Sequence, residues 1–210
     1  MSYVYKYPRP MVTVDAAVFA LDEDALDVLL VRRARDPYRG RWALPGGFVN
    51  MDETLEEAVE RELEEETGLA GISFHPLQAY SEPDRDPRGR NISFAFLALT
   101  LSFDGDIKAG DDAASVRWFP ASDLPDLAFD HGRIIEDAVV RLRELVLTSD
   151  ILVSILPAPI PLSMLERAME LVFEGPVDMP RLLEHLLAAG LLVPAGKAEN
   201  GEPLFSPPAD

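Results

Sequence analysis

Residues 46–69 read GGFVNMDETLEEAVERELEEETGL, and this stretch decides how the rest of the chain is interpreted. Thr54 followed by Glu57 fits a helical capping box, and Gly68 fits a helix C-terminus, so we expect a helix over residues 54–67. Nine side chains of the stretch are carboxylates and only Arg61 is basic; the carboxylates are Asp52, Glu53, Glu56, Glu57, Glu60, Glu62, Glu64, Glu65 and Glu66. Like charges three or four residues apart destabilise a helix, so this cluster needs an explanation.

Helical geometry divides these side chains among three faces. An apolar stripe should pack on a sheet and four glutamates should lie opposite it in water: Leu55, Val59 and Leu63, then Glu56, Glu57, Glu60 and Glu64. Glu62, Glu65 and Glu66 share a third face. A solvated acidic helix is the ordinary interpretation of such a run, but it leaves the repulsion on this third face unrelieved. A divalent cation would relieve it, and carboxylate oxygens suit Mg²⁺ or Mn²⁺.

The spacing of the residues matches a known motif. Gly47 is followed after five residues by Glu53 and after seven more by Arg61-Glu62-Leu63; Glu65-Glu66 and Gly68-Leu69 then follow, each after one residue. This pattern resembles the Nudix hydrolase signature at every specified position, and the resemblance covers roughly residues 10–147. It implies an α/β fold, an α/β/α sandwich around a mixed sheet. It also implies metal-dependent hydrolysis of a nucleoside diphosphate linked to another group.

The resemblance also implies roles for single residues. Glu62, Glu65 and Glu66 would bind the metal with the Gly46 carbonyl, Arg61 would orient the glutamates, and Glu53 would support a second ion or the helix geometry. Bound Mg²⁺ or Mn²⁺ would neutralise pyrophosphate oxygens, position a water molecule and lower its pKa.

A general base is expected from the loop before the last strand, as in other members of the family. Here that loop is DGDIKAGDDAASV, residues 104–116, which makes Asp112 the candidate and Asp111 its alternative. Both aspartates are also ordinary turn residues. His75 and His131 show no ligand-like spacing, so we assign them no role.

Two stretches bear on the substrate. RRARDPYRGRW, residues 32–42, concentrates arginines in an acidic chain, so Arg33 and Arg35 are candidates for binding an anion; a solvated strand end is the alternative. SEPDRDPRGRNISFAFLAL, residues 81–99, resembles the same region of small ADP-ribose pyrophosphatases and of the Nudix-related regulators of NAD metabolism. Arg85 and Arg88 are therefore candidate pyrophosphate or ribose contacts, with a hairpin turn held by internal ion pairs as the alternative.

The resemblance points to ADP-ribose as the substrate, cleaved to AMP and ribose 5-phosphate. Phe48 is a candidate for stacking on the adenine ring, although an aromatic side chain more often belongs to the core.

Composition limits the partners. The formal net charge of the 210 residues is −18, which argues against general affinity for nucleic acid or anionic membranes. The chain has no cysteine, no apolar run of the roughly 18 residues that span a bilayer, and no signal-peptide core in MSYVYKYPRP. We therefore expect a cytoplasmic protein without a membrane partner.

The pattern of predicted strands, helices and prolines along the sequence indicates two domains. Strands are expected over residues 12–21, 26–34, 72–82, 91–103 and 115–120, and a helix over 130–146. ILPAPIPL, residues 155–162, has three prolines and breaks this pattern. We place a boundary there, with a Nudix domain over 1–150 and a small winged-helix-like domain over 151–210. The latter would have helices over 162–173 and 178–190 and a hairpin at Asn200-Gly201.

A Nudix domain followed by a winged helix resembles the regulators of NAD metabolism, in which the first part senses ADP-ribose and the second binds DNA. That is the alternative function. The intact signature favours an enzyme, and residues 151–210 carry three basic and eight acidic side chains, a net charge of 3 − 8 = −5, which disfavours DNA binding. We prefer to interpret this domain as a structural or dimerisation module, and we expect a homodimer, as is common in the family.

Overall fold

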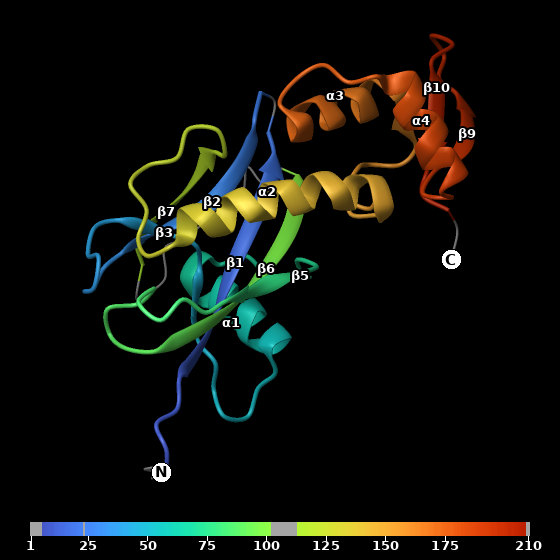
Figure 1. The fold of residues 1–210 in the computed structure, drawn as a ribbon. Helices are drawn as coiled ribbons and strands as arrows, with labels where there is room; N and C mark the ends of the chain where they lie inside the picture. Colours follow the sequence, from blue (N-terminus) through green and yellow to red (C-terminus); the bar gives the residue numbers. More distant parts are fainter. Residues whose placement is uncertain (1–5, 23, 102–112, 209–210) are drawn as a thin grey trace.

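The computed structural model describes residues 6–22, 24–101 and 113–208. Its N-terminal part is a mixed sheet with one helix on each face (Figure 1). The strands are β1 (Met11–Leu21), β2 (Leu26–Arg33), β3 (Trp42–Ala43), β4 (Gly46–Phe48), β5 (His75–Tyr80), β6 (Asn91–Leu101) and β7 (Ala113–Pro120), and the helices are α1 (Leu55–Thr67) and α2 (His131–Thr148). This is the predicted α/β/α sandwich.

The sheet has the order β3-β2-β1-β6-β5, with β4 paired to β1 and β7 paired to β2. β1 runs parallel to β6 and antiparallel to β2 and β4, which makes the sheet mixed. Successive side chains of a strand point to opposite faces. Ala17, Phe19 and Leu21 of β1 therefore enter the apolar cluster under α2, while Val14 and Ala16 enter the cluster under α1.

Local sequence signals define α1. The capping box is complete, since the Thr54 hydroxyl accepts from the Glu57 N–H while the Glu57 carboxylate accepts from the Thr54 N–H. Gly68 ends the helix in the left-handed conformation, with φ of 75°. The apolar stripe is buried at Val59 and Leu63, and the outer glutamates are exposed as predicted. One face of α1 therefore packs on the sheet and another remains available to a ligand.

The C-terminal part has the predicted winged-helix-like order. Its elements are β8 (Ile160–Pro161), α3 (Leu162–Phe173), α4 (Met179–Ala188), β9 (Val193–Lys197) and β10 (Pro203–Ser206). The three strands form an antiparallel sheet with the order β8-β10-β9. Gly201 adopts a φ of 85° in the turn between β9 and β10, which confirms the predicted hairpin.

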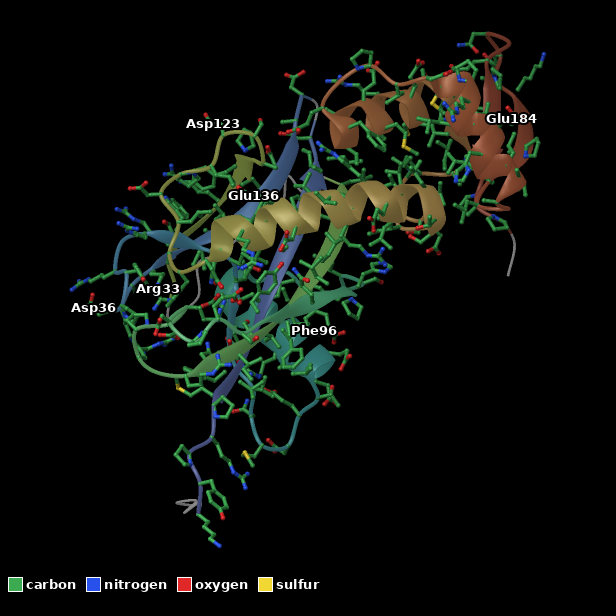
Figure 2. All side chains as sticks on the ribbon, viewed as in Figure 1. Arg33, Asp36, Phe96, Asp123, Glu136 and Glu184 are labelled. Atoms are coloured by element: carbon green, nitrogen blue, oxygen red, sulfur yellow. The ribbon has the colours of Figure 1, made fainter. Side chains whose placement is uncertain are left out.

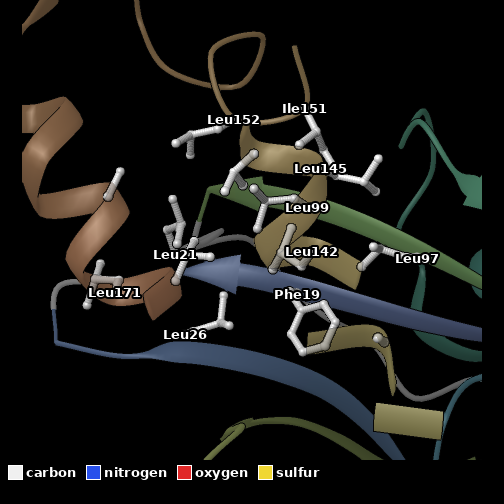
Figure 3. Close-up of a cluster of buried hydrophobic side chains, with 14 of the residues drawn as sticks. Phe19, Leu21, Leu26, Leu97, Leu99, Leu142, Leu145, Ile151, Leu152 and Leu171 are labelled. Carbon is white, nitrogen blue, oxygen red and sulfur yellow. The ribbon is translucent and has the colours of Figure 1, made fainter. Parts of the chain in front are cut away.

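One apolar cluster crosses the predicted domain boundary. It contains side chains of β1, β2, β6 and α2 together with side chains of α3 and α4. Figure 3 shows Leu171 of α3 beside Leu21 and Leu26. The Arg143 guanidinium of α2 also donates to the Val172 carbonyl over 3.0 Å. The C-terminal part therefore packs on the helix and strands that precede it, and the division at residue 150 remains a proposal.

The structure differs from the predicted elements at short strands that are defined by backbone pairing alone. Residues 36–47, where no strand was predicted, contain β3 and part of β4, and the proline-rich residues 155–162 contain β8. These strands are two or three residues long, so side-chain periodicity could not reveal them. Among the described residues, no helix is long and apolar enough to cross a bilayer.

Candidate active site

A pocket of about 470 Å³ lies at one end of the sheet. The segments around it are the loop after β2, the segment from β4 into α1, the β5–β6 loop and the start of α2. Figure 2 places Arg33 near the beginning of α2. Eight of the residues predicted from the sequence line the pocket: Arg33, Arg35, Gly46, Phe48, Arg61, Glu62, Arg85 and Arg88. The fold thus brings the arginine-rich stretches to the glutamate-rich helix.

Arg61 is the centre of an ion-pair network on α1. Its guanidinium binds both carboxylate oxygens of Glu53, at 2.6 and 2.9 Å. It also binds Glu62 at 2.8 Å and Glu65 at 3.1 Å, and it donates to the Phe48 carbonyl. The hydrogen bond from Arg61 lowers the pKa of Glu53 to about 2. The structure therefore shows the contacts that the predicted orienting role of Arg61 requires.

Glu62 and Glu66 are carboxylates with restricted access to water. Glu66 accepts a hydrogen bond of 3.0 Å from the Gly46 N–H, and burial raises its pKa to about 8. Burial also raises the pKa of Glu62. At Gly47, an added Cβ would lie 2.3 Å from the Glu62 carboxylate, so any other residue would displace this carboxylate from its position. Two desolvated carboxylates therefore approach the glycine-rich backbone.

The carboxylates of this arrangement suit a metal ion in their chemistry more than in their present geometry. Among the described residues, no three His, Cys, Asp or Glu side chains stand in metal-binding geometry, and Arg61 takes an oxygen of Glu62 and of Glu65. The donor chemistry nevertheless fits a hard divalent cation. The oxygens of Glu62 and Glu66 are desolvated and repel each other, and a cation would offset both costs.

The four candidate substrate-binding arginines differ in their surroundings. Arg33 donates to the Pro37 carbonyl at 2.8 Å, and Arg88 pairs with Asp86 at 2.7 Å. Arg35 lines the pocket. Arg85 is different, because its side chain is only 3% exposed and forms a two-pronged ion pair with Asp130 at 2.6 and 2.9 Å.

Arg85 is thus held by an ion pair to the start of α2, whereas the Arg88–Asp86 pair lies within the turn itself. Arg33 and Arg88 are better placed to meet a ligand. Phe48 is 43% exposed and lies against the Arg88 guanidinium, at the edge of the same pocket.

Sequence reasoning missed a buried polar group on the floor of the pocket. His131 was assigned no role, yet its Nδ1 accepts from the Leu44 N–H and its Nε2 lies 3.6 Å from Asp15. Asp15 also accepts from the Ser93 hydroxyl and faces Arg85 at 3.6 Å. Burial lowers the pKa of His131. A charged residue inside the apolar run VTVDAAVF was the available signal for Asp15, since such residues are seldom buried unless paired.

Asp112, the predicted general base, and its alternative Asp111 lie outside the described residues. Their roles stay predictions.

The family of the chain is established by its sequence as a whole. The model of the family described as NUDIX domain matches residues 11–138, more than half of the chain, so the chain belongs to the NUDIX family. Residues 47–69, which comprise α1 and the segments on either side of it, carry the complete hydrolase signature, and Nudix hydrolases generally use a divalent metal.

Individual relatives divide into two kinds. The chain is 47% identical over 131 residues to the ADP-ribose pyrophosphatase of Methanocaldococcus jannaschii, which covers 62% of this chain and 74% of that protein. It is 29% identical over 190 residues to the ADPR responsive transcriptional repressor NtrR of Acinetobacter baylyi, which covers 89% of this chain and 76% of that protein.

A solved structure is similar over nearly the whole chain. Shewanella oneidensis NrtR matches with a TM-score of 0.76 and 30% identity, over 94% of each chain. That protein has also been solved with a 27mer DNA, and its NUDIX domain with ADP ribose. The likeness therefore includes the winged-helix-like part as well as the hydrolase fold.

Proposed function

We propose that this protein hydrolyses the pyrophosphate bond of ADP-ribose, giving AMP and ribose 5-phosphate, with Mg²⁺ or Mn²⁺ as the metal. The observation that carries the proposal is the complete signature of residues 47–69, whose helix α1 contributes Arg61 and Glu62 to an arginine-lined pocket. The 47% identity to an ADP-ribose pyrophosphatase supports the choice of substrate. The homodimer and the cytoplasmic location remain predictions from the sequence.

Residues of the signature would bind the metal and keep its ligands in place. Glu62 and Glu66, with Glu65 and the Gly46 carbonyl, would hold the metal, which supplies charge neutralisation and a water of lowered pKa. Arg61 keeps Glu62 in place through the 2.8 Å ion pair.

Other residues would bind the substrate or activate the attacking water. Arg33 and Arg88 would bind the diphosphate, because guanidinium groups match phosphate oxygens in geometry and charge. Phe48, exposed at the edge of the pocket, would stack on adenine. Asp112 is the proposed base for the attacking water.

A regulator is the second candidate, and one observation favours it. The likeness to Shewanella oneidensis NrtR extends over 94% of the chain, including the winged-helix-like part. Against DNA binding stands the charge of residues 151–210, which is 3 − 8 = −5. Protein contacts to DNA phosphates depend on Lys and Arg, so residues 151–210 are poorly suited to binding DNA.

Product analysis tests both candidates. The protein would be incubated with Mg²⁺ or Mn²⁺ and ADP-ribose, beside NADH, diadenosine polyphosphates, ADP-glucose and nucleoside triphosphates. Metal-dependent release of AMP and ribose 5-phosphate, strongest with ADP-ribose, is expected. Tight binding of ADP-ribose without turnover would instead favour the sensor, and the next measurement would then be DNA binding.

A further inference from the structure

Phe129, the residue before the N-cap of α2, has an unusual backbone. Its φ is 51°, in the left-handed region that bulky side chains seldom adopt. Tyr38 has a φ of 63°, and its ring meets the Phe129 ring edge-on at 4.8 Å. Strained residues of this kind persist only where surrounding contacts hold them, and they cluster at functional sites. The ring of Phe129 is therefore held in place by contacts that outweigh the strain.

The contacts of the Phe129 ring point into the pocket. The Arg33 guanidinium carbon lies 4.8 Å from its centroid, and that of Arg88 lies 5.6 Å from it. Arg33 ends β2 and Arg88 belongs to the β5–β6 loop, so one ring joins two walls of the pocket. Guanidinium groups are attracted to aromatic faces. Phe129 thus lies against two cations that come from distant parts of the chain.

The two arginines are costly to hold together. The pKa of Arg33 is lowered by burial first and by the charge of Arg88 second. Pro37 accepts from Arg33, and Asp86 pairs with Arg88, which orients each planar group. An anion with two charged groups would relieve the repulsion and could accept hydrogen bonds from both guanidiniums.

We propose that Phe129 is a positioning residue that holds Arg33 and Arg88 as a clamp for the diphosphate of the substrate. The proposal rests on the proposed function for the identity of the substrate, but only a diphosphate is required for the clamp itself. A purely structural role is the competing explanation, because Phe129 also packs on the cluster of Val31, Ala43 and Ala128.

Kinetics of matched variants separates the two explanations. Phe129→Leu keeps an apolar side chain and removes the aromatic face, whereas Phe129→Tyr keeps the face. Phe74→Leu removes a ring that packs edge-on against Phe96 in the cluster under α1, and it controls for general loss of aromatic packing. Phe129→Leu should raise KM for ADP-ribose roughly tenfold, the order expected from two lost cation–π contacts, with kcat nearly unchanged. Phe129→Tyr and Phe74→Leu should keep the KM of the original protein.

Binding without metal gives an independent readout. Calorimetry in EDTA would compare ADP, which has a diphosphate, with AMP, which does not. Phe129→Leu should weaken ADP binding several-fold more than AMP binding. In an Arg33→Ala and Arg88→Ala background the same substitution should have no further effect on ADP. Thermal unfolding would verify that each variant is folded, and Phe129→Met would replace Phe129→Leu if the latter is not.

The outcomes are distinct. Unchanged KM and unchanged ADP binding in a folded Phe129→Leu protein would overturn the clamp and leave the hydrolase proposal intact. If the original protein does not cleave ADP-ribose, the proposed function fails, and ADP binding alone then decides on the clamp. An equal loss of affinity for ADP and AMP would also overturn it, because the ring would then serve general packing.

Discussion

The backbone N–H of Leu44 donates a hydrogen bond of 2.8 Å to Nδ1 of His131, which lies 87 positions further along the chain. Nδ1 therefore carries no proton, and Nε2 faces Asp15 with its N–H. Two residues beyond Leu44, the Gly46 N–H donates to Glu66. This histidine thus connects the start of α2 to the segment that approaches the signature helix.

His131→Ala should destabilise the protein by about 1–3 kcal/mol, because it leaves the buried Leu44 N–H without an acceptor. His131→Asn should cost less, since an amide oxygen can stand near the position of Nδ1. Urea unfolding of both variants measures the difference. Equal losses for Ala and Asn would show that the hydrogen bond contributes little and that side-chain volume decides.

The same residue predicts a dependence of stability on pH. Burial lowers the pKa of His131 in the folded state, whereas the unfolded chain takes up a proton near the ordinary value of about 6.5. Its contribution to stability is therefore present above about pH 6.5 and is lost as the pH falls through the folded pKa. Unfolding free energies between pH 5 and pH 8 should decline in acid more steeply for the original protein than for His131→Asn. If the unfolding free energies of the two proteins change in parallel with pH, His131 is not the source of the pH dependence.

Glu62→Gln and Glu66→Gln should each reduce kcat by more than the roughly 10- to 100-fold typical of residues that merely support a metal ligand. Glu64→Gln, on the exposed side of the same helix, is the control and should leave turnover unchanged. Steady-state rates at saturating metal test this. Normal turnover in both Glu62→Gln and Glu66→Gln would remove the metal assignment.

Without metal, Glu66→Gln should also stabilise the fold. The Glu66 pKa is raised to about 8 by burial, so its contribution is present below the unfolded pKa of 4.5 and is lost as the pH rises through about 8. In EDTA, the melting temperature of Glu66→Gln should exceed that of the original protein by the largest amount above pH 8. A variant that melts at or below the original temperature there would contradict this.

Arg85 and Arg88 should respond differently to replacement by Ala. Arg85→Ala removes the cation that faces Asp130 and Asp15, and breaking a buried ion pair costs about 3–5 kcal/mol. The Arg88 side chain is 36% exposed, so Arg88→Ala should change KM more than stability. Melting temperatures and KM values of the two variants give the comparison. A large rise in KM without destabilisation in Arg85→Ala would restore its predicted role as a substrate contact.

Deleting residues 151–210 should change the oligomeric state if these residues form a dimerisation module. It should also lower the melting temperature, because it uncovers buried side chains of β1 and α2 such as Leu21 and Leu142. Light scattering with size-exclusion chromatography gives the mass. A truncated protein with the same subunit number and full activity would exclude the proposal.

Local signals in the sequence were sufficient for α1. Its cap, its apolar stripe and its glutamate face all depend on residues within a few turns of one another, and the structure contains each of them. The strands with clear alternation were predicted for the same reason. Turn chemistry predicted the β9–β10 hairpin at Gly201.

The floor of the pocket depends on contacts that no local pattern records. Asp15 and His131 are more than a hundred positions apart, and they meet only because α2 crosses the face of the sheet on which Asp15 lies. Phe129 reads in the sequence as one more apolar residue before a helix. Arg85 and Arg88 look equivalent in DRDPRG, and only the packing of α2 shows that Arg85 forms a buried ion pair with Asp130.

The two faces of β1 support different parts of the protein. Its even-numbered residues from Val14 to Val18 support the helix with the signature, and its odd-numbered residues from Asp15 to Leu21 face α2 and the core shared with the C-terminal part. A residue-by-residue scan of this strand would therefore alternate between two phenotypes, impaired turnover and a loosened C-terminal part, except at Asp15, which lines the pocket. An insertion of one residue would exchange the two sets and damage both at once.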